Sequence, residues 1–144
     1  MKKFLIWLFI KSIVPRMKVV FTDEGSSFEY ETNTIYLTLG EDCNGFMRHL
    51  KNVHGVKGAD NFSIIMWQIL HEIGHYFTLD YCEEDDSIER AICALIDKDT
   101  AANSEKIQDM YFNMEKEYEA TEWAINYVIE HTNKCKLISD LLKD

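Results

Sequence analysis

The chain has 144 residues, of which 47% are hydrophobic and 12% aromatic, a composition typical of one folded domain and unlike that of a disordered chain. Its 25 acidic and 15 basic residues give a formal net charge of −10. A net acidic surface repels phosphate backbones and anionic lipid, which argues against direct binding of nucleic acid and favours a protein or peptide partner.

The first 16 residues are predicted to be an N-terminal helix or an extension. Residues 4–14 favour a short helix that ends at Pro15, because proline cannot continue a helix. The apolar run of residues 4–10 is shorter than the roughly 20 residues that span a bilayer. We expect a helix packed on the domain of a cytoplasmic protein. The alternatives are a membrane-surface anchor, a signal sequence and a true start at Met17.

Three short segments after this helix are typical of β-strands. Residues 18–23, 27–31 and 34–39 are rich in β-branched and aromatic side chains that alternate in part with polar ones. The letters EGS and TN between them are typical of turns. The economical prediction is a small antiparallel sheet.

Helical patterns occupy most of the remaining chain. The predicted helices cover residues 45–53 behind a capping Asn44, 60–80 with Asp60 or Ser63 as the N-cap, 86–97, 103–133, and a short C-terminal tail at 135–144. The fourth of these would be about 45 Å long, with a bend or a break as the alternative to one straight helix. We therefore predict an α+β fold in which residues 1–144 form a single domain.

The letters HEIGH lie inside the predicted helix of residues 60–80. Positions i and i+4 share one face of an α-helix, so His71 and His75 can give two imidazole nitrogens to one ion. Zinc accepts neutral histidine nitrogen in a four-coordinate shell. Glu72 is turned about 100° from His71 and can act as a general base instead of a ligand. Gly74 costs helix stability, which close packing of another backbone would explain.

A catalytic zinc needs a third protein ligand. Glu115, Glu119 and Glu122 form a polar stripe along the last long helix, and their spacing does not choose among them. We expect His49 and His54 to be loop or surface residues. We expect His131 to interact with a helix C-terminus. Cys82 is a remote candidate for a place near the site.

The segment YEATEWAINYVI, residues 118–129, together with HEIGH resembles the ImmA/IrrE metallopeptidases. The second motif of that family reads roughly E-A-(N/D)-x-(F/Y/W)-A. The resemblance implies that Glu119 is the third zinc ligand beside His71 and His75, within a compact α+β zincin core. Thr121 departs from the family pattern, because it stands where Asn or Asp is common.

The same resemblance implies a function. Members of the family are zinc endopeptidases, many of them encoded on phages and mobile elements, where they relieve repression by promoting cleavage of a helix-turn-helix repressor. We therefore expect a zinc-dependent endopeptidase with Glu72 as the catalytic base and a protein substrate. The alternatives are a non-catalytic zincin-fold module that sequesters a repressor and a peptidase attached to a membrane.

Overall fold

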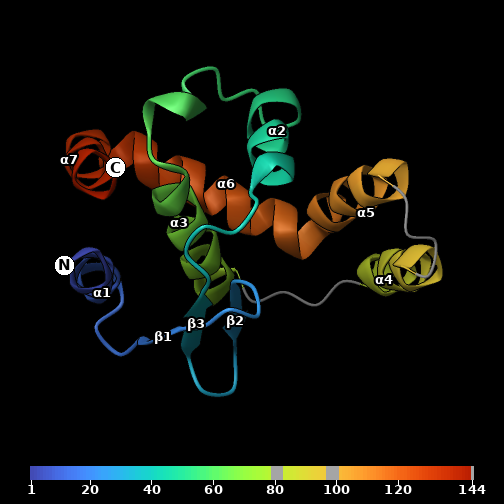
Figure 1. The fold of residues 1–144 in the computed structure, drawn as a ribbon, viewed down its shortest axis with the longest axis horizontal. Helices are drawn as coiled ribbons and strands as arrows, with labels where there is room; N and C mark the ends of the chain where they lie inside the picture. Colours follow the sequence, from blue (N-terminus) through green and yellow to red (C-terminus); the bar gives the residue numbers. More distant parts are fainter. Residues whose placement is uncertain (79–82, 97–100, 144) are drawn as a thin grey trace.

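The computed structural model describes residues 1–78, 83–96 and 101–143 (Figure 1). The predicted α+β class is confirmed, because seven α-helices accompany a three-stranded sheet in this part of the chain. The elements in chain order are α1 (Lys2–Ile13), β1 (Lys18–Phe21), β2 (Ser27–Glu29), β3 (Thr34–Leu37), α2 (Asn44–Asn52), the 3₁₀ helix η1 (Ala59–Asn61), α3 (Ile64–Phe77), α4 (Glu83–Ile96), α5 (Ala101–Asn113), α6 (Glu115–Glu130) and α7 (Thr132–Leu142).

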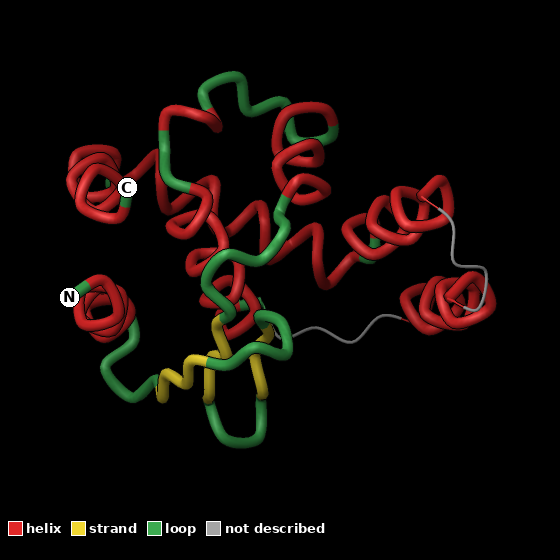
Figure 2. Tube along the Cα trace, viewed as in Figure 1, coloured by secondary structure: helices red, strands yellow, loops and turns green. Residues whose placement is uncertain are grey.

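The sheet lies at one edge of the molecule (Figure 2) and is mixed, so the prediction of an antiparallel sheet is wrong for one strand pair. β2 and β3 form an antiparallel hairpin, but β1 runs parallel to β3 in the order β1-β3-β2. Thr34, Ile35 and Leu37 of β3 are buried, whereas the residues of β1 and β2 are all at least partly exposed. The most buried strand takes the central position, where both of its edges are hydrogen-bonded.

α3 passes through the middle of the molecule, with α6 against one side and strands β2 and β3 against another. Residues 66–75 are all buried, so this helix has no solvent-facing side over nearly three turns. Ser63 is its N-cap, and the Ser63 hydroxyl accepts a hydrogen bond from the amide of Ile65 at 3.2 Å. Asp60, the other predicted cap, lies in η1.

The predicted long helix of residues 103–133 is divided into three helices. The first break is at Met114, where the backbone is extended (φ −59°, ψ 138°) and the side chain is buried; the second is at His131. These breaks place the last turn of α5 and the first turn of α6 at an angle to each other (Figure 1). Side chains from both helices can therefore face one cleft.

The start of α2 and the packing of α1 complete the description of the helices. The N-cap of α2 is Cys43 rather than Asn44, and Asp42 accepts the hydrogen bond from the Asn44 amide at 3.0 Å. α1 packs against α7 and buries Ile6, Phe9 and Ile10 in the main core. No helix in the described ranges has both the length and the apolarity needed to cross a membrane.

Gly74 allows α6 to approach α3 closely, as its place in the middle of a helix suggested. A Cβ atom added at Gly74 would lie 3.0 Å from the Cα atom of Ala120 and even nearer to the Ala120 carbonyl oxygen. Backbone atoms cannot move aside as a side-chain tip can. The two helices therefore touch backbone to backbone at this point.

We expect Gly74→Ala to reduce the free energy of unfolding by about 2 kcal/mol, because overpacking of this kind forces two helices apart. The measurement is urea denaturation followed by circular dichroism. Gly58→Ala is the control, because a Cβ there would meet only the side-chain amide of Asn61, which can rotate away. Equal stability of Gly74→Ala and the parent chain would contradict the close contact.

Candidate metal centre

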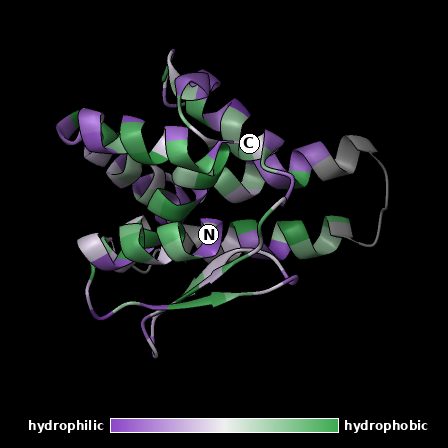
Figure 3. Cartoon of the chain, turned by 60° about the vertical axis from the view of Figure 1, so that its left-hand side comes forward, coloured by the Kyte–Doolittle hydropathy of each residue, from purple (hydrophilic) through white to green (hydrophobic). Residues whose placement is uncertain are grey.

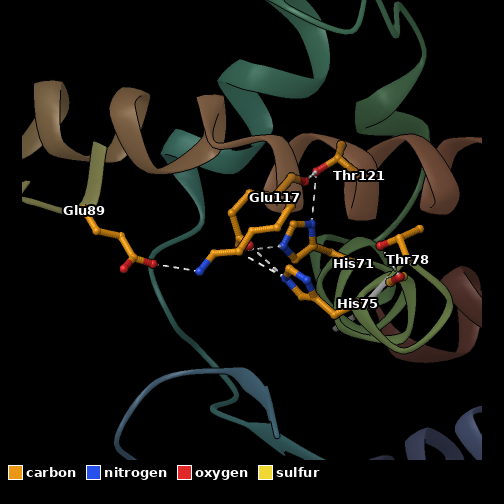
Figure 4. A network of polar contacts seen from close by, with 8 residues as sticks. His71, His75, Thr78, Glu89, Glu117 and Thr121 are labelled. Atoms are coloured by element: carbon orange, nitrogen blue, oxygen red, sulfur yellow. Dashed lines mark hydrogen bonds and ion pairs between the residues drawn. The ribbon is translucent and has the colours of Figure 1, made fainter. Parts of the chain in front are cut away.

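Three buried side chains from two helices converge at the contact between α3 and α6. His71 and His75 come from α3, Glu117 comes from the first turn of α6, and one potential ligand atom of each lies within 4.8 Å of the other two. Figure 4 shows both imidazole rings directed at the Glu117 carboxylate. The predicted co-facial arrangement of the two histidines is thus present, and they meet a carboxylate.

Glu117 is the anionic member of this group. Its Oε1 lies 3.5 Å from Nε2 of His71, and its Oε2 lies 2.9 Å from Nε2 of His75. Burial alone would raise the pKa of Glu117, but hydrogen bonds and charge from the two histidines hold it well below its usual value. Burial likewise tends to lower the pKa of His75, yet the hydrogen bond and charge of Glu117 raise it. The carboxylate is therefore ionised at neutral pH.

Thr121 determines which ring nitrogen of neutral His71 carries no proton. The Thr121 hydroxyl lies one turn after Glu117, donates its proton to the Glu117 carbonyl oxygen at 3.0 Å and lies 3.0 Å from Nδ1 of His71. Because the single hydroxyl proton is already used, the Thr121 oxygen must accept a hydrogen bond from Nδ1–H. Neutral His71 then carries its lone pair on Nε2, directed at Glu117.

This arrangement fits a bound divalent cation. In neutral His71 the lone pair on Nε2 faces a carboxylate oxygen, and two acceptors attract each other only through a cation or a proton between them. Oε2 of Glu117 is buried and makes no well-directed hydrogen bond within the described part of the chain. Two imidazole nitrogens and one carboxylate oxygen form a donor set that zinc accepts, with a fourth position left open.

Glu72, the glutamate of HEIGH, is buried beside this cluster. Burial raises the pKa of Glu72, partly offset by the nearby charges of His71 and His75. Its carboxylate has no hydrogen-bond partner among the described residues, yet it lines two cavities. A buried carboxylate without a partner costs stability unless it serves another purpose.

The two cavities share Glu72 and Tyr111 in their linings, and the smaller cavity also contacts strand β2. One, of about 230 Å³, also contacts His71 and Glu41. The other, of about 140 Å³, also contacts His75 and Glu117. Together they form a cleft that opens onto both sides of the candidate metal ligands.

Aromatic rings close the cleft behind His71. The His71 ring packs at 5.0 Å from Phe46 of α2 and at 6.1 Å from Phe112 of α5, and these two phenyl rings stack at 5.4 Å. Arg48 and Asp109 join α2 to α5 through an ion pair at 2.8 Å. The apolar wall keeps water from one side of the His71 ring.

The structure places a different glutamate at the histidines from the one that the sequence resemblance implied. Glu117 lies against His71 and His75, and Glu119 is not among the clustered ligand atoms. Residues two apart on an α-helix point about 200° away from each other, so only one of this pair can face α3. Glu115 and Glu122 are also outside the cluster, and Glu122 contacts His54 at 3.1 Å.

The helical spacing of buried residues in α6 leaves two candidates, residues 117 and 118, for the buried position between Met114 and Thr121. The buried positions Met114, Thr121 and Val128 follow steps of seven, and either residue 117 or residue 118 completes the steps of three and four between the first two. Of these two, the aromatic Tyr118 is the residue type more often buried in a core than Glu117. The buried position instead carries the charge, because that charge meets the two histidines.

The three remaining histidines lie outside the cluster of metal-type ligands. The prediction of a loop or surface position is wrong for His49, which lies within α2 and has a side chain only 4% exposed. His54 does lie in the loop after α2, although its side chain is 1% exposed. His131 does lie at the C-terminus of α6, with Nδ1 at 3.2 Å from the Tyr127 carbonyl oxygen. Cys82 lies outside the described residues.

Comparison of the chain with models of protein families, with curated proteins and with solved structures finds no match. The assignment of a function therefore depends on the geometry of the cluster and on the resemblance of the two motifs.

We expect Glu117→Gln to abolish zinc binding, because an amide oxygen lacks the charge that holds the ion. Zinc is measured by elemental analysis of the purified chain after incubation with the metal. Glu119→Gln is the matched control, two residues away on the same helix, and should retain zinc. The opposite pattern of loss would restore Glu119 as the ligand.

We expect Thr121→Val to weaken zinc binding about 10- to 100-fold, because the His71 ring loses the hydrogen bond that orients it. Competition with a chromophoric chelator measures the affinity. Thr132→Val is the control, because the Thr132 hydroxyl also donates to the carbonyl one turn earlier, that of Val128, but does not lie at His71. Equal zinc affinity of the Thr121→Val chain and the parent would show that Thr121 does not orient the ligand.

Proposed function

We propose that the chain is a zinc-dependent endopeptidase with a zincin-type site in which His71, His75 and Glu117 hold the ion. The observation that carries this proposal is the position of Glu72. This buried carboxylate has no partner in the described ranges and lines a cleft directly beside three convergent metal-type donors. A structural metal site needs no such carboxylate, whereas hydrolysis needs a base at this place.

Zinc bound at these residues would polarise the substrate carbonyl and lower the pKa of water at the site. Glu72 then supplies the proton transfers. Its carboxylate accepts a proton from the attacking water and returns it to the nitrogen of the leaving amine. The raised pKa of Glu72 brings it nearer to neutral pH, where a carboxyl group can both accept and donate a proton.

Tyr111 is the proposed donor to the substrate carbonyl oxygen. Its side chain lines both cavities, and burial together with the charges of Glu117 and Glu72 raises the pKa of the phenol. The phenol therefore stays protonated and can stabilise negative charge that develops on oxygen. Tyr118 and Tyr127 do not line these cavities; their rings stack on His54 at 4.4 Å and on His131 at 4.1 Å.

The edge strand beside the cleft supports an extended peptide as substrate. β2 is an edge strand of the sheet, and Ser27 and Phe28 line the smaller cavity. An edge strand presents unpaired backbone groups to which an extended chain can add. We propose a protein substrate bound in this way, with a helix-turn-helix repressor as the first protein to test, since the two sequence motifs resemble those of the ImmA/IrrE family.

We expect Glu72→Gln to retain zinc and to lower the rate of peptide cleavage by about 10²- to 10⁴-fold, because the base is lost while the ligands stay. The substrates are fluorescein-labelled casein and a mixed peptide library read by mass spectrometry. Glu130→Gln, which changes an exposed carboxylate at the C-terminal end of α6 that lines neither cavity, is the control and should cleave at a similar rate.

Two results would contradict the proposal. A Glu72→Gln chain that keeps full activity would remove Glu72 from the role of base. A zinc-loaded parent chain that leaves casein, the library and a co-encoded repressor uncut, but binds that repressor, would assign the fold to sequestration instead.

A further inference from the structure

Helix α1 is apolar on two sides, and the domain covers only one of them. Ile6, Phe9 and Ile10 are buried, whereas Phe4, Trp7 and Leu8 are 57%, 41% and 44% exposed. The exposed three are spaced i, i+3 and i+4, so they share the outward side of the helix. A helix that is hydrophobic all round is normally buried, and this one lies at the edge of the molecule (Figure 1).

The neighbouring helix also exposes apolar side chains. α7 packs against α1 and exposes Leu137 and Leu141, which are one turn apart. Figure 3 turns this side of the molecule toward the viewer and shows hydrophobic residues along the helix beside the N-terminus. Exposed apolar side chains that are grouped in this way mark an interaction site.

The same region carries the opposite charge to the rest of the protein. The first 22 residues include five basic side chains and no acidic one, while all 25 acidic residues follow. Among the described residues, no carboxylate forms an ion pair with Lys3, Lys11, Arg16 or Lys18. The charge of these four side chains is therefore not offset by an ion pair within the part of the chain that the structure describes.

Two lysines of α1 lie over aromatic rings, one on the outward face of the helix and one in strand β1. The ammonium group of Lys11 lies 5.8 Å from the centre of the Trp7 ring, and that of Lys3 lies 5.2 Å from the centre of the Phe21 ring. The aliphatic parts of such lysines run along apolar surface while the charged groups stay in water. Aromatic rings flanked by lysines match the boundary between acyl chains and anionic headgroups.

We propose that the outward face of α1 binds the surface of an anionic lipid bilayer, with the helix lying in the plane of the interface. Phe4, Trp7 and Leu8 enter the apolar boundary, and Lys3 and Lys11 contact lipid phosphates. A second copy of the chain fits less well, because pairing through this face would bring two basic surfaces together.

A bilayer bound at α1 would not cover the candidate metal centre. α1 and α7 lie on one side of the molecule in Figure 1, and α5, which contributes Tyr111 and Phe112 to the cleft, lies on the other. The acidic remainder of the protein is repelled by anionic lipid. The charge asymmetry therefore orients the domain with the cleft away from the bilayer. This proposal depends on α1 and is independent of metal binding.

The experiment is cosedimentation of the intact chain with lipid vesicles. We expect binding to vesicles of phosphatidylcholine mixed with phosphatidylglycerol, and little binding to phosphatidylcholine alone. Binding should weaken between about 0.01 M and about 0.15 M salt, because the screening length falls from about 30 Å to about 8 Å. A signal that is equal for both lipid mixtures would remove the charge argument and overturn the proposal.

Two double variants test the face. We expect each to weaken vesicle binding at least about tenfold. The double variant Phe4→Ser with Leu8→Ser removes apolar area that the bilayer would bury. The double variant Lys3→Glu with Lys11→Glu reverses the charge that attracts anionic lipid. The controls are Val53→Ser and Lys57→Glu, which change an exposed apolar residue and an exposed lysine elsewhere and should bind as the parent does.

Circular dichroism of each variant checks that the fold is retained, which the exposure of the substituted side chains favours. Full binding by both double variants would overturn the proposal. So would a dimer, seen by light scattering, that the Phe4→Ser and Leu8→Ser variant dissociates while no vesicle binding is found, because the face would then join two copies.

Discussion

The backbone contact between α3 and α6 is the constraint on which the candidate site depends. Gly74 leaves room for the backbone of Ala120, so α6 can lie close enough for Glu117 to reach two histidines on the neighbouring helix. A larger side chain at position 74 would separate the helices and lengthen the distances from Glu117 to the two histidines. The glycine that weakens α3 as a helix is thus the residue that permits the assembly around it.

Burial of several ionisable groups in one place is the second constraint. Glu117 is stabilised by two histidines, and His71 is oriented by Thr121. Glu72 has no comparable hydrogen bonds in the described part of the chain, and its burial costs free energy that the fold must offset elsewhere. Natural proteins accept such costs mainly at functional sites, which is why the geometry supports hydrolysis more strongly than a purely structural metal site.

The two proposals concern opposite sides of the molecule. The cleft is formed by β2, α3, α5 and α6, whereas the α1 face is supported by α7. A peptidase held at a bilayer in this orientation would act on proteins near that surface. Because the basic residues at the N-terminus are separated from the acidic remainder, the same net charge of −10 is compatible with repulsion from nucleic acid and with a local, oriented attraction to anionic lipid.

Local patterns in the sequence predict most of the helices and strands, and two of the three clustered side chains. HEIGH on an apolar helix predicts two co-facial histidines, and Gly74 within it predicts a close helix contact, because both follow from local helical geometry. The tertiary structure decided the direction of β1 beside β3, the breaks at Met114 and His131, and the choice of Glu117 over Glu119. Those depend on which neighbour each face meets. A helical pattern gives the spacing of a buried stripe but cannot show that one position in it is a carboxylate held by two histidines from another helix.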